Sequence, residues 1–308
     1  MRVVVAGDTG LAGSAISARF NELNWETFGI NTSTLDLFDQ EAVLELLHSI
    51  KPDLVVDAAA RSGGIGANDK NPVSFMVENL RIQNNLMEAA FSAKVKKFIF
   101  LGSSCIYPRN AKQPITEEAL MTGPLEETNS AYAVAKISGL ELIKAYRKQF
   151  GTSWVSLMPT NLYGPKDNFN SATGHVLPAM IGKFIEAVEQ GRKEVVLWGT
   201  GSPRREFLHV RDLARAISDI GINYDSPLHL NVGSGIDISI LELADLVSKE
   251  TSYAGAVVWD TSKPDGTPRK LLDVSRVKSL GWEPLVSLED GIRETISWYK
   301  SNPNWKKR

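Results

Sequence analysis

A tyrosine and a lysine four residues apart are the first pair in the sequence that could do chemistry. Tyr132 and Lys136 would share one face of a helix expected over residues 132–149. A lysine cation beside a phenol should lower the phenol's pKa from its usual value of about 10. Such a phenol could give a proton to a carbonyl oxygen while hydride arrives at the carbon. Only Tyr132, of seven tyrosines, has a lysine four residues later, although one such pair can arise by chance.

A serine and a cysteine follow the strand expected over residues 97–102. Ser103 and Cys105 would lie at the carboxyl edge of the sheet, where open α/β folds bind ligands. Farther along the chain, His175 lies in a polar loop region before an apolar stretch. The residues alone leave simpler interpretations open. Cys105 could be a small buried apolar side chain, and His175 a surface or helix-start histidine.

Three glycines after the first expected strand favour a dinucleotide site. Gly7, Gly10 and Gly13 follow residues 2–6 and begin a helix over residues 11–23. Glycines there permit a tight turn, and the helix N-terminus offers N–H groups to a pyrophosphate. The spacing is GxxGxxG rather than GxGxxG, so the motif is weak by itself. Its position after strand one strengthens it.

The end of the second expected strand, residues 26–30, bears on the choice of cofactor. An acid there would bind the adenosine ribose, whereas an arginine would favour a 2′-phosphate. Residues 31–34 read Asn-Thr-Ser-Thr, so neither is present and nothing there is expected to repel a phosphate. Asp36 and Leu37 could meet the adenine. The alternative for Asp36 is a cap of the helix that follows.

The elements that must position these residues alternate along the first half of the chain. Expected strands at 2–6, 26–30, 54–59, 97–102 and 153–158 alternate with expected helices at 11–23, 41–50, 73–93 and 132–149. This alternation predicts right-handed crossovers and a Rossmann-like, doubly wound parallel sheet over residues 1–165. Polar loops over residues 163–174 and 259–268 indicate a smaller C-terminal substrate-binding lobe over 166–308. A helix over 212–221 should return to the first domain, to which we assign 212–235.

The composition narrows the class of protein. The chain has 308 residues, 43% of them hydrophobic and 23% charged, with a net charge of −2. These values describe a folded protein without the basic surface that nucleic acid or an anionic membrane attracts. The apolar run over residues 3–6 is too short for a signal peptide or a membrane span, so the cytoplasm is the expected compartment. The four histidines are scattered, and no metal site is expected.

Several longer segments carry a family resemblance. They are residues 62–65 (Ser-Gly-Gly-Ile), 101–108 (Leu-Gly-Ser-Ser-Cys-Ile-Tyr-Pro), 159–165 (Pro-Thr-Asn-Leu-Tyr-Gly-Pro), 167–169, 175–176, 198–201, 205–207 and 265–267. With them the chain resembles the GDP-L-fucose synthases, within the extended short-chain dehydrogenases/reductases. The likeness covers nearly the whole chain. Its most specific parts are the Ser-Ser-Cys-Ile-Tyr-Pro run and the downstream histidine.

The resemblance implies one site with two activities on GDP-4-keto-6-deoxy-D-mannose. These are epimerisation at C3 and C5 and NADPH-dependent reduction of the C4 ketone, giving GDP-L-fucose. The implied catalytic residues are Ser103, Cys105, Tyr132, Lys136 and His175. Those near NADP(H) would be Gly7, Asp8, Thr9, Gly10, Leu11, Ala12, Gly13, Asp36, Leu37, Leu101, Gly102, Lys136, Pro159, Asn161, Leu162 and His175. The GDP-sugar would meet Lys183, Trp198, Arg205 and Asp265. A homodimer is expected at the level of the family.

Some alternatives stay open. A related GDP-4-keto-sugar enzyme of the colitose or heptose type would carry the same side chains. A non-catalytic dinucleotide-sensing protein on this fold fits less well, because all five catalytic residue types are retained. The chain also departs from well-known bacterial members, which carry arginines where it has Thr9 and Thr32. A weaker preference for NADPH is therefore expected.

Overall fold

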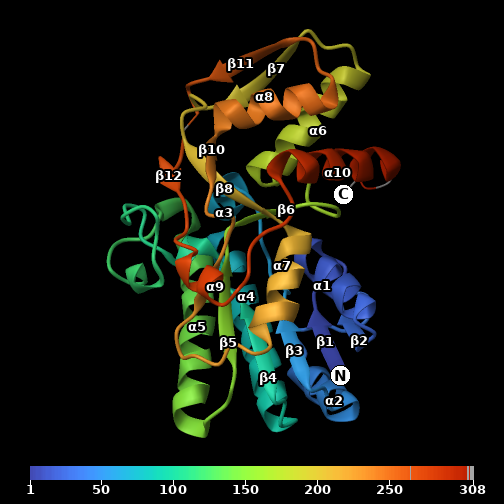
Figure 1. The fold of residues 1–308 in the computed structure, drawn as a ribbon, viewed down its shortest axis with the longest axis vertical. Coiled ribbons are helices and arrows are strands. Elements are labelled where there is room, and N and C mark those ends of the chain that lie inside the picture. The colour runs from blue at the N-terminus through green and yellow to red at the C-terminus, as the bar shows by residue number, and fades with distance from the viewer. Residues whose placement is uncertain (264, 304, 306–308) are drawn as a thin grey trace.

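The computed structural model describes residues 1–263, 265–303 and 305. A parallel six-stranded sheet forms the centre of the lower lobe in Figure 1, in the order β2-β1-β3-β4-β5-β9. Its strands are β1 (Arg2–Ala6), β2 (Glu26–Ile30), β3 (Leu54–Asp57), β4 (Lys97–Leu101), β5 (Val155–Pro159) and β9 (Leu230–Val232). The order changes direction at β1, and open α/β sheets bind ligands at such a switch point. The glycine turn follows β1 directly.

All strands of this sheet except the edge strand β2 are almost wholly buried, which explains why they are apolar runs. Successive residues of β1 point to opposite faces: Val3 and Val5 join one apolar core and Val4 the other. Helix α1 (Leu11–Glu22) packs against α7 (Val210–Ala216), and α4 (Pro72–Ser92) contacts both α2 (Gln40–Ile50) and α5 (Ser130–Phe150). The predicted Rossmann-like, doubly wound α/β fold is confirmed.

The upper lobe in Figure 1 has an apolar core of its own. Helices α6 (Val176–Glu189), α8 (Ile240–Thr251) and α10 (Leu288–Ser301) contribute Phe184, Val247 and Ile296 to it. Strands β7 (Glu194–Trp198) and β11 (Ala256–Asp260) pair in parallel. Strand β8 (Arg204–His209) pairs with β6 (Asn161–Tyr163), β10 (Asp237–Ser239) and β12 (Arg269–Lys270).

The remaining elements are short. They are α3 (Ile65–Lys70), α9 (Ser275–Ser279), and the 3₁₀ turns η1 (Ser104–Ile106), η2 (Glu117–Ala119) and η3 (Glu127–Asn129). After α7 the chain makes a π-helical turn over Ile217–Gly221 and later adds β9 to the edge of the main sheet. The chain therefore enters the upper lobe and returns more than once.

Some predicted boundaries were wrong. The expected strand over 54–59 ends at Asp57, and helix α3 and strand β6 were not predicted. Tyr163, the first residue of the loop expected over 163–174, belongs to β6 instead. The loop expected over 259–268 loses Trp259 and Asp260 to β11, and its residue 264 lies outside the described residues. In both loops a strand partner decides the boundary, and that partner is distant in sequence.

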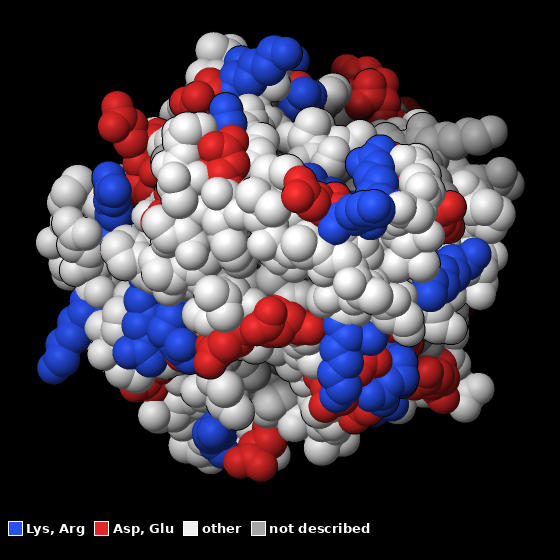
Figure 2. All heavy atoms as spheres, turned by 90° about the horizontal axis from the view of Figure 1, so that it is seen from above, with Lys and Arg blue, Asp and Glu red and all other residues white. Residues whose placement is uncertain are grey.

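The surface carries both signs of charge. Viewed from the end that holds β7 and β11, acidic and basic side chains are interspersed rather than separated by sign (Figure 2). None of the helices in the described part of the chain combines the length and apolarity that a membrane crossing would need.

Candidate active site

The glycine turn packs closely against the start of α1 and the end of β3. Gly7 has a φ of +83°, and a Cβ added there would come within 2.8 Å of the Ala58 carbonyl oxygen. A Cβ on Gly13 would lie 2.2 Å from the Gly7 carbonyl oxygen, so turn and helix touch. Gly10 caps α1 with no side-chain hydrogen bond, and the first turn holds no acid. The N–H groups there suit a pyrophosphate.

An acidic side chain lies at the end of β2, although residues 31–34, which follow β2, include none. Gly7 and Asp8 both donate their N–H groups to the Ile30 carbonyl, at 2.7 and 3.3 Å. The Asp8 carboxylate accepts a hydrogen bond of 2.9 Å from Nδ2 of Asn31. The expectation that nothing here repels a phosphate is therefore wrong. The carboxylate comes from the glycine turn, which the sheet brings beside β2.

The segment between β2 and α2 presents Asp36 and Leu37. Asp36 accepts a hydrogen bond from the Phe38 N–H at 2.9 Å, and it does not cap α2. That cap is Asp39, whose side chain accepts from the Ala42 N–H. The alternative interpretation of Asp36 as a helix cap is therefore wrong. The Leu37 carbonyl accepts a 2.8 Å hydrogen bond from Asn85 on α4, which fixes the segment against the first lobe.

Lys136 is buried below the carboxyl edge of the sheet. It is 3% exposed, and its Nζ donates to the Leu101 carbonyl at 2.9 Å. The same Nζ lies 4.7 Å from the centre of the Phe100 ring. Burial lowers the pKa of Lys136, while the negative charge of Asp57 acts in the opposite direction. The ammonium is thus held by a carbonyl oxygen, an aromatic face and a carboxylate.

Asp57 is a buried residue of the site that sequence reasoning missed. It ends β3, and its Oδ1 accepts from the Ala59 N–H at 3.2 Å. Oδ2 has no hydrogen-bond partner among the described residues. Burial raises the pKa of Asp57 to about 6, against the attraction of Lys136. The sequence signal was an acid at the end of an apolar strand.

Tyr132 lies in the first turn of α5, near Ser103 and Cys105. Burial raises the pKa of its phenol and the charge of Cys105 adds to this, whereas a hydrogen bond with the Ser103 side chain lowers it. The expected lowering by Lys136 is wrong, because burial is the largest effect and the Lys136 ammonium is engaged elsewhere. Ser103 is the neighbour that favours the ionised phenol.

The turn that carries Cys105 is locked to the sheet. Ser103 caps the 3₁₀ turn η1, where its Oγ accepts from the Cys105 N–H at 3.3 Å. Two residues beyond Cys105, the buried Tyr107 hydroxyl contacts Nε2 of His229 at 2.9 Å and donates to Oδ1 of Asn231 at 2.5 Å. Asn231 belongs to β9, so the last strand of the sheet fixes the position of the thiol.

The thiol of Cys105 lies between donors from both lobes. Its Sγ is 3.6 Å from Nδ2 of Asn129 and 3.5 Å from Nζ of Lys270. These three residues help to line a cavity of about 20 Å³. Asn129 precedes α5, whereas Lys270 ends β12 in the upper lobe. Neither was predicted, because only the folded chain brings them to the thiol.

His175 is the N-terminal cap residue of α6, and its side chain makes no capping hydrogen bond. His175 is exposed, although neighbouring protein atoms shield its imidazole from part of the solvent. This partial desolvation lowers the pKa of His175, and the positive charge of Lys270 lowers it further. Lys270 thus contacts the thiol, and its charge also acts on the imidazole.

Residues 159–162 cross the carboxyl end of the sheet. Pro159 ends β5, and Asn161 and Leu162 belong to β6. Nδ2 of Asn161 donates to the carbonyl of the buried Glu206 at 2.8 Å. On the neighbouring strand, the Gly102 N–H donates to the Leu157 carbonyl at 2.9 Å, directly after β4. These backbone segments adjoin the edge that Lys136 and Ser103 occupy.

The four predicted substrate residues gather in the upper lobe. Trp198 is 57% exposed, with Nζ of Lys183 5.9 Å and that of Lys263 5.8 Å from its ring. Asp265 accepts from the N–H and Oγ1 of Thr200, at 2.7 and 2.9 Å, and attracts the partly buried Arg205. An exposed aromatic ring among cations suits a phosphorylated nucleotide.

The chain belongs to the NAD dependent epimerase/dehydratase family, whose model matches residues 3–233. It is 49% identical over 308 residues to a putative GDP-L-fucose synthase 2 of Arabidopsis thaliana, covering 100% of this chain and 94% of that one. The GDP-L-fucose synthase of Escherichia coli K12 is 45% identical over 311 residues, at 98% and 97% coverage. A solved GDP-L-fucose synthetase from Naegleria fowleri, bound to NADP, is 30% identical with a TM-score of 0.89, covering 98% and 95%. The predicted resemblance is confirmed.

Proposed function

We propose that this chain converts GDP-4-keto-6-deoxy-D-mannose to GDP-L-fucose, using NADP(H) as the hydride carrier. One observation carries the proposal. Lys270 contacts the Cys105 thiol, and its charge also acts on the His175 imidazole. Cys105 in turn lies near Tyr132 of the Ser103–Tyr132–Lys136 set. Reduction of a ketone needs only the Ser103–Tyr132–Lys136 set. Cys105 and His175 add side chains that can exchange protons near neutral pH.

In this proposal one lobe binds the cofactor and the other binds the GDP-sugar. Residues 1–165 and 212–235 bind NADP(H), with its pyrophosphate on the glycine turn and the N-terminus of α1. Residues 166–308 bind the GDP-sugar through Lys183, Trp198, Arg205 and Asp265. Residues 264, 304 and 306–308 of that range lie outside the described part of the chain. We also propose a homodimer that works in the cytoplasm.

The epimerase step uses the acidity that the C4 ketone gives to the C–H groups at C3 and C5. Cys105 and His175 remove a proton from one face of each carbon and return one to the other. The Ser103 and Tyr132 hydroxyls stabilise the enolate oxygen that forms between these steps. Lys270 and Asn129 orient the sulfur and stabilise its charge when it is ionised.

The reduction step follows at C4. A nicotinamide bound here would supply the hydride to the carbon. Tyr132 gives its phenolic proton to the oxygen. Ser103 hydrogen-bonds that phenol and favours its ionised form. Lys136, one turn further along α5, is held by the Leu101 carbonyl and the charge of Asp57, and supplies the buried positive charge of this half of the site.

Identification of the product tests this function. The purified protein is incubated with GDP-4-keto-6-deoxy-D-mannose and NADPH, and the sugar is identified by nuclear magnetic resonance. We expect GDP-L-fucose, with one NADPH consumed per sugar. Faster turnover of a GDP-4-keto sugar with another C3 substituent would favour the colitose or heptose type. Binding of nucleotide without turnover of any ketosugar would favour a sensing protein.

A further inference from the structure

The glycine turn delivers a carboxylate to the end of β2. The backbone N–H groups of Gly7 and Asp8 both bind the Ile30 carbonyl, so the turn is fixed to the last residue of that strand. The side chain of Asp8 lies directly over Gly29, where an added Cβ would come within 2.0 Å of Oδ2. Glycine at position 29 leaves the space that this carboxylate occupies.

The neighbouring loop fixes the orientation of the carboxylate. Oδ1 of Asn31 accepts from the Ser33 N–H at 3.0 Å and from the Ser33 hydroxyl at 2.5 Å. This leaves Nδ2 of Asn31 to donate to Oδ1 of Asp8 at 2.9 Å. The second carboxylate oxygen, Oδ2, makes no hydrogen bond and no ion pair with the described residues. A ligand at the end of β2 could donate a hydrogen bond to this oxygen.

We infer that Asp8 is the residue that hydrogen-bonds the adenosine ribose of the cofactor, and that it weakens the preference for a 2′-phosphate. The inference rests on the proposed nicotinamide site and concerns its specificity. In this fold the adenosine ribose lies at the end of β2, where an acid accepts a hydrogen bond from the 2′-hydroxyl. Here the acid reaches that place from the other side, from the turn after β1.

Charge makes the same carboxylate unfavourable for NADPH. A 2′-phosphate carries up to two negative charges, and like charges a few ångströms apart repel strongly near a protein surface. No arginine or lysine lies within residues 31–34 to offset this, and Thr9 and Thr32 supply only neutral hydroxyls. A neutral hydrogen bond stabilises a phosphate less than a charged one does. The chain therefore discriminates only weakly between NADPH and NADH.

Nucleotide binding to the intact protein tests this directly. Dissociation constants for NADP⁺ and NAD⁺ are measured by calorimetry for the wild type, Asp8→Asn and Asp8→Ser. The wild type should bind NADP⁺ no more than about tenfold tighter than NAD⁺. Both variants should bind NADP⁺ roughly tenfold tighter than the wild type and NAD⁺ more weakly, by a few fold, because one like charge and one acceptor are lost. The kcat/KM values for NADPH and NADH should move in the same direction.

A matched control removes one negative charge outside the glycine turn and outside the end of β2. Glu41 is an exposed acid in the first turn of α2, so Glu41→Gln changes the net charge equally. It should leave the ratio of the two constants within about twofold, because exposed charges farther away are screened. An unchanged ratio in both folded Asp8 variants, checked by melting curves, would overturn the inference while leaving the proposed function intact. Failure of every form to bind either nucleotide would contradict the proposed function itself.

Discussion

The two halves of the site are positioned in different ways. Tyr132 and Lys136 lie one turn apart on α5, and the same lobe supplies their neighbours Ser103 and Asp57. Cys105, by contrast, is half-buried and meets Lys270, which comes from β12 of the other lobe.

This contrast teaches that the two chemistries depend on different parts of the fold. Hydride transfer needs one rigid geometry, and α5 together with the ends of β3 and β4 in the same lobe provides it. Proton exchange at two carbons needs groups on both sides of the sugar, and only the meeting of the lobes provides them. Substitutions should therefore separate the two activities.

The largest effect is expected in the reductase half. Tyr132→Phe removes the proposed proton donor to the C4 oxygen, and positioned acids contribute about 10² to 10⁴ in rate. NADPH oxidation with the ketosugar should fall by that factor, with nucleotide binding unchanged by calorimetry. Tyr146→Phe on the same helix is the control, since Tyr146 makes only ring contacts among the described residues and should stay within about twofold. Near wild-type turnover by Tyr132→Phe would remove the phenol from the mechanism.

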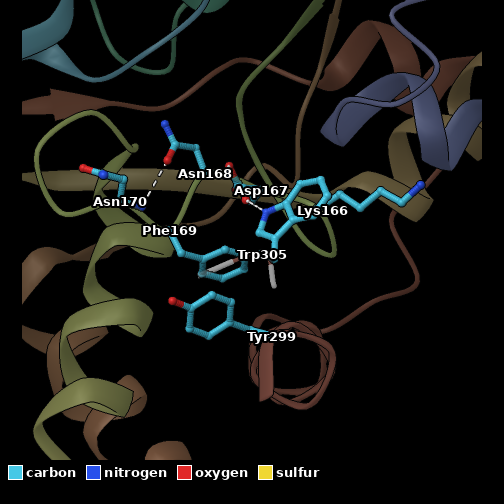
Figure 3. A pocket seen from close by; sticks show the side chains of 7 residues that line it. All are labelled: Lys166, Asp167, Asn168, Phe169, Asn170, Tyr299 and Trp305. Carbon is cyan, nitrogen blue, oxygen red and sulfur yellow. Dashed lines mark hydrogen bonds between the residues drawn. The ribbon is translucent and has the colours of Figure 1, made fainter. Parts of the chain in front are cut away.

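A smaller effect, on stability, is expected in the segment that leads to His175. Asp167 is 4% exposed beside a pocket of about 160 Å³, which Figure 3 shows between residues 166–170 and α10. Its Oδ2 has no hydrogen-bond partner among the described residues, and burial raises its pKa to about 7. Between about pH 4 and pH 7 the folded chain keeps this proton while the unfolded chain loses it. Folding stability should therefore fall as the pH rises through this window.

Asp167→Asn tests this sign. The amide cannot ionise, so the variant should gain stability relative to the wild type between pH 5 and pH 8, by about 2 kcal/mol. Urea unfolding at the two pH values measures this, and proton exchange into the ketosugar should be unchanged per folded molecule. Parallel stability curves for the two proteins would show that Asp167 is ionised throughout.

The smallest effect concerns the contact between the lobes. Lys270→Met removes the ammonium that lies 3.5 Å from the Cys105 sulfur, one of the two donors that contact it. Alkylation of Cys105 by iodoacetamide at pH 7.5 should slow by about tenfold, because the sulfur loses the charged donor that orients it. Arg269→Met is the control, because Arg269 pairs with Asp237. Equal alkylation rates in both variants would exclude Lys270 as the partner of the thiol.

The features of the site that the sequence predicted are those that depend on residues close together in the chain. The i, i+4 spacing of Tyr132 and Lys136 and the glycines after β1 report positions on single elements. The two errors in their chemistry arose from tertiary contacts: burial dominates the phenol, and Asp8 reaches β2 across the sheet. Asp57 and Lys270 were missed for the same reason. Each gains its role only from a neighbour that is distant in sequence.

Solvent deuterium exchange tests the central claim, that Cys105 and His175 form an acid/base set separate from the reductase group. The ketosugar is incubated in heavy water without reduced cofactor, and deuterium at C3 and C5 is followed by nuclear magnetic resonance. The wild type and Tyr132→Phe should label both carbons. Cys105→Ser should label them far more slowly, because a hydroxyl is a much weaker base than a thiolate, and His175→Ala should lose exchange on the opposite face. If Cys105 were only packing, Cys105→Ser would cost roughly 1–3 kcal/mol in a melting curve and leave exchange per folded molecule unchanged. Full labelling of both carbons by both variants would contradict the account.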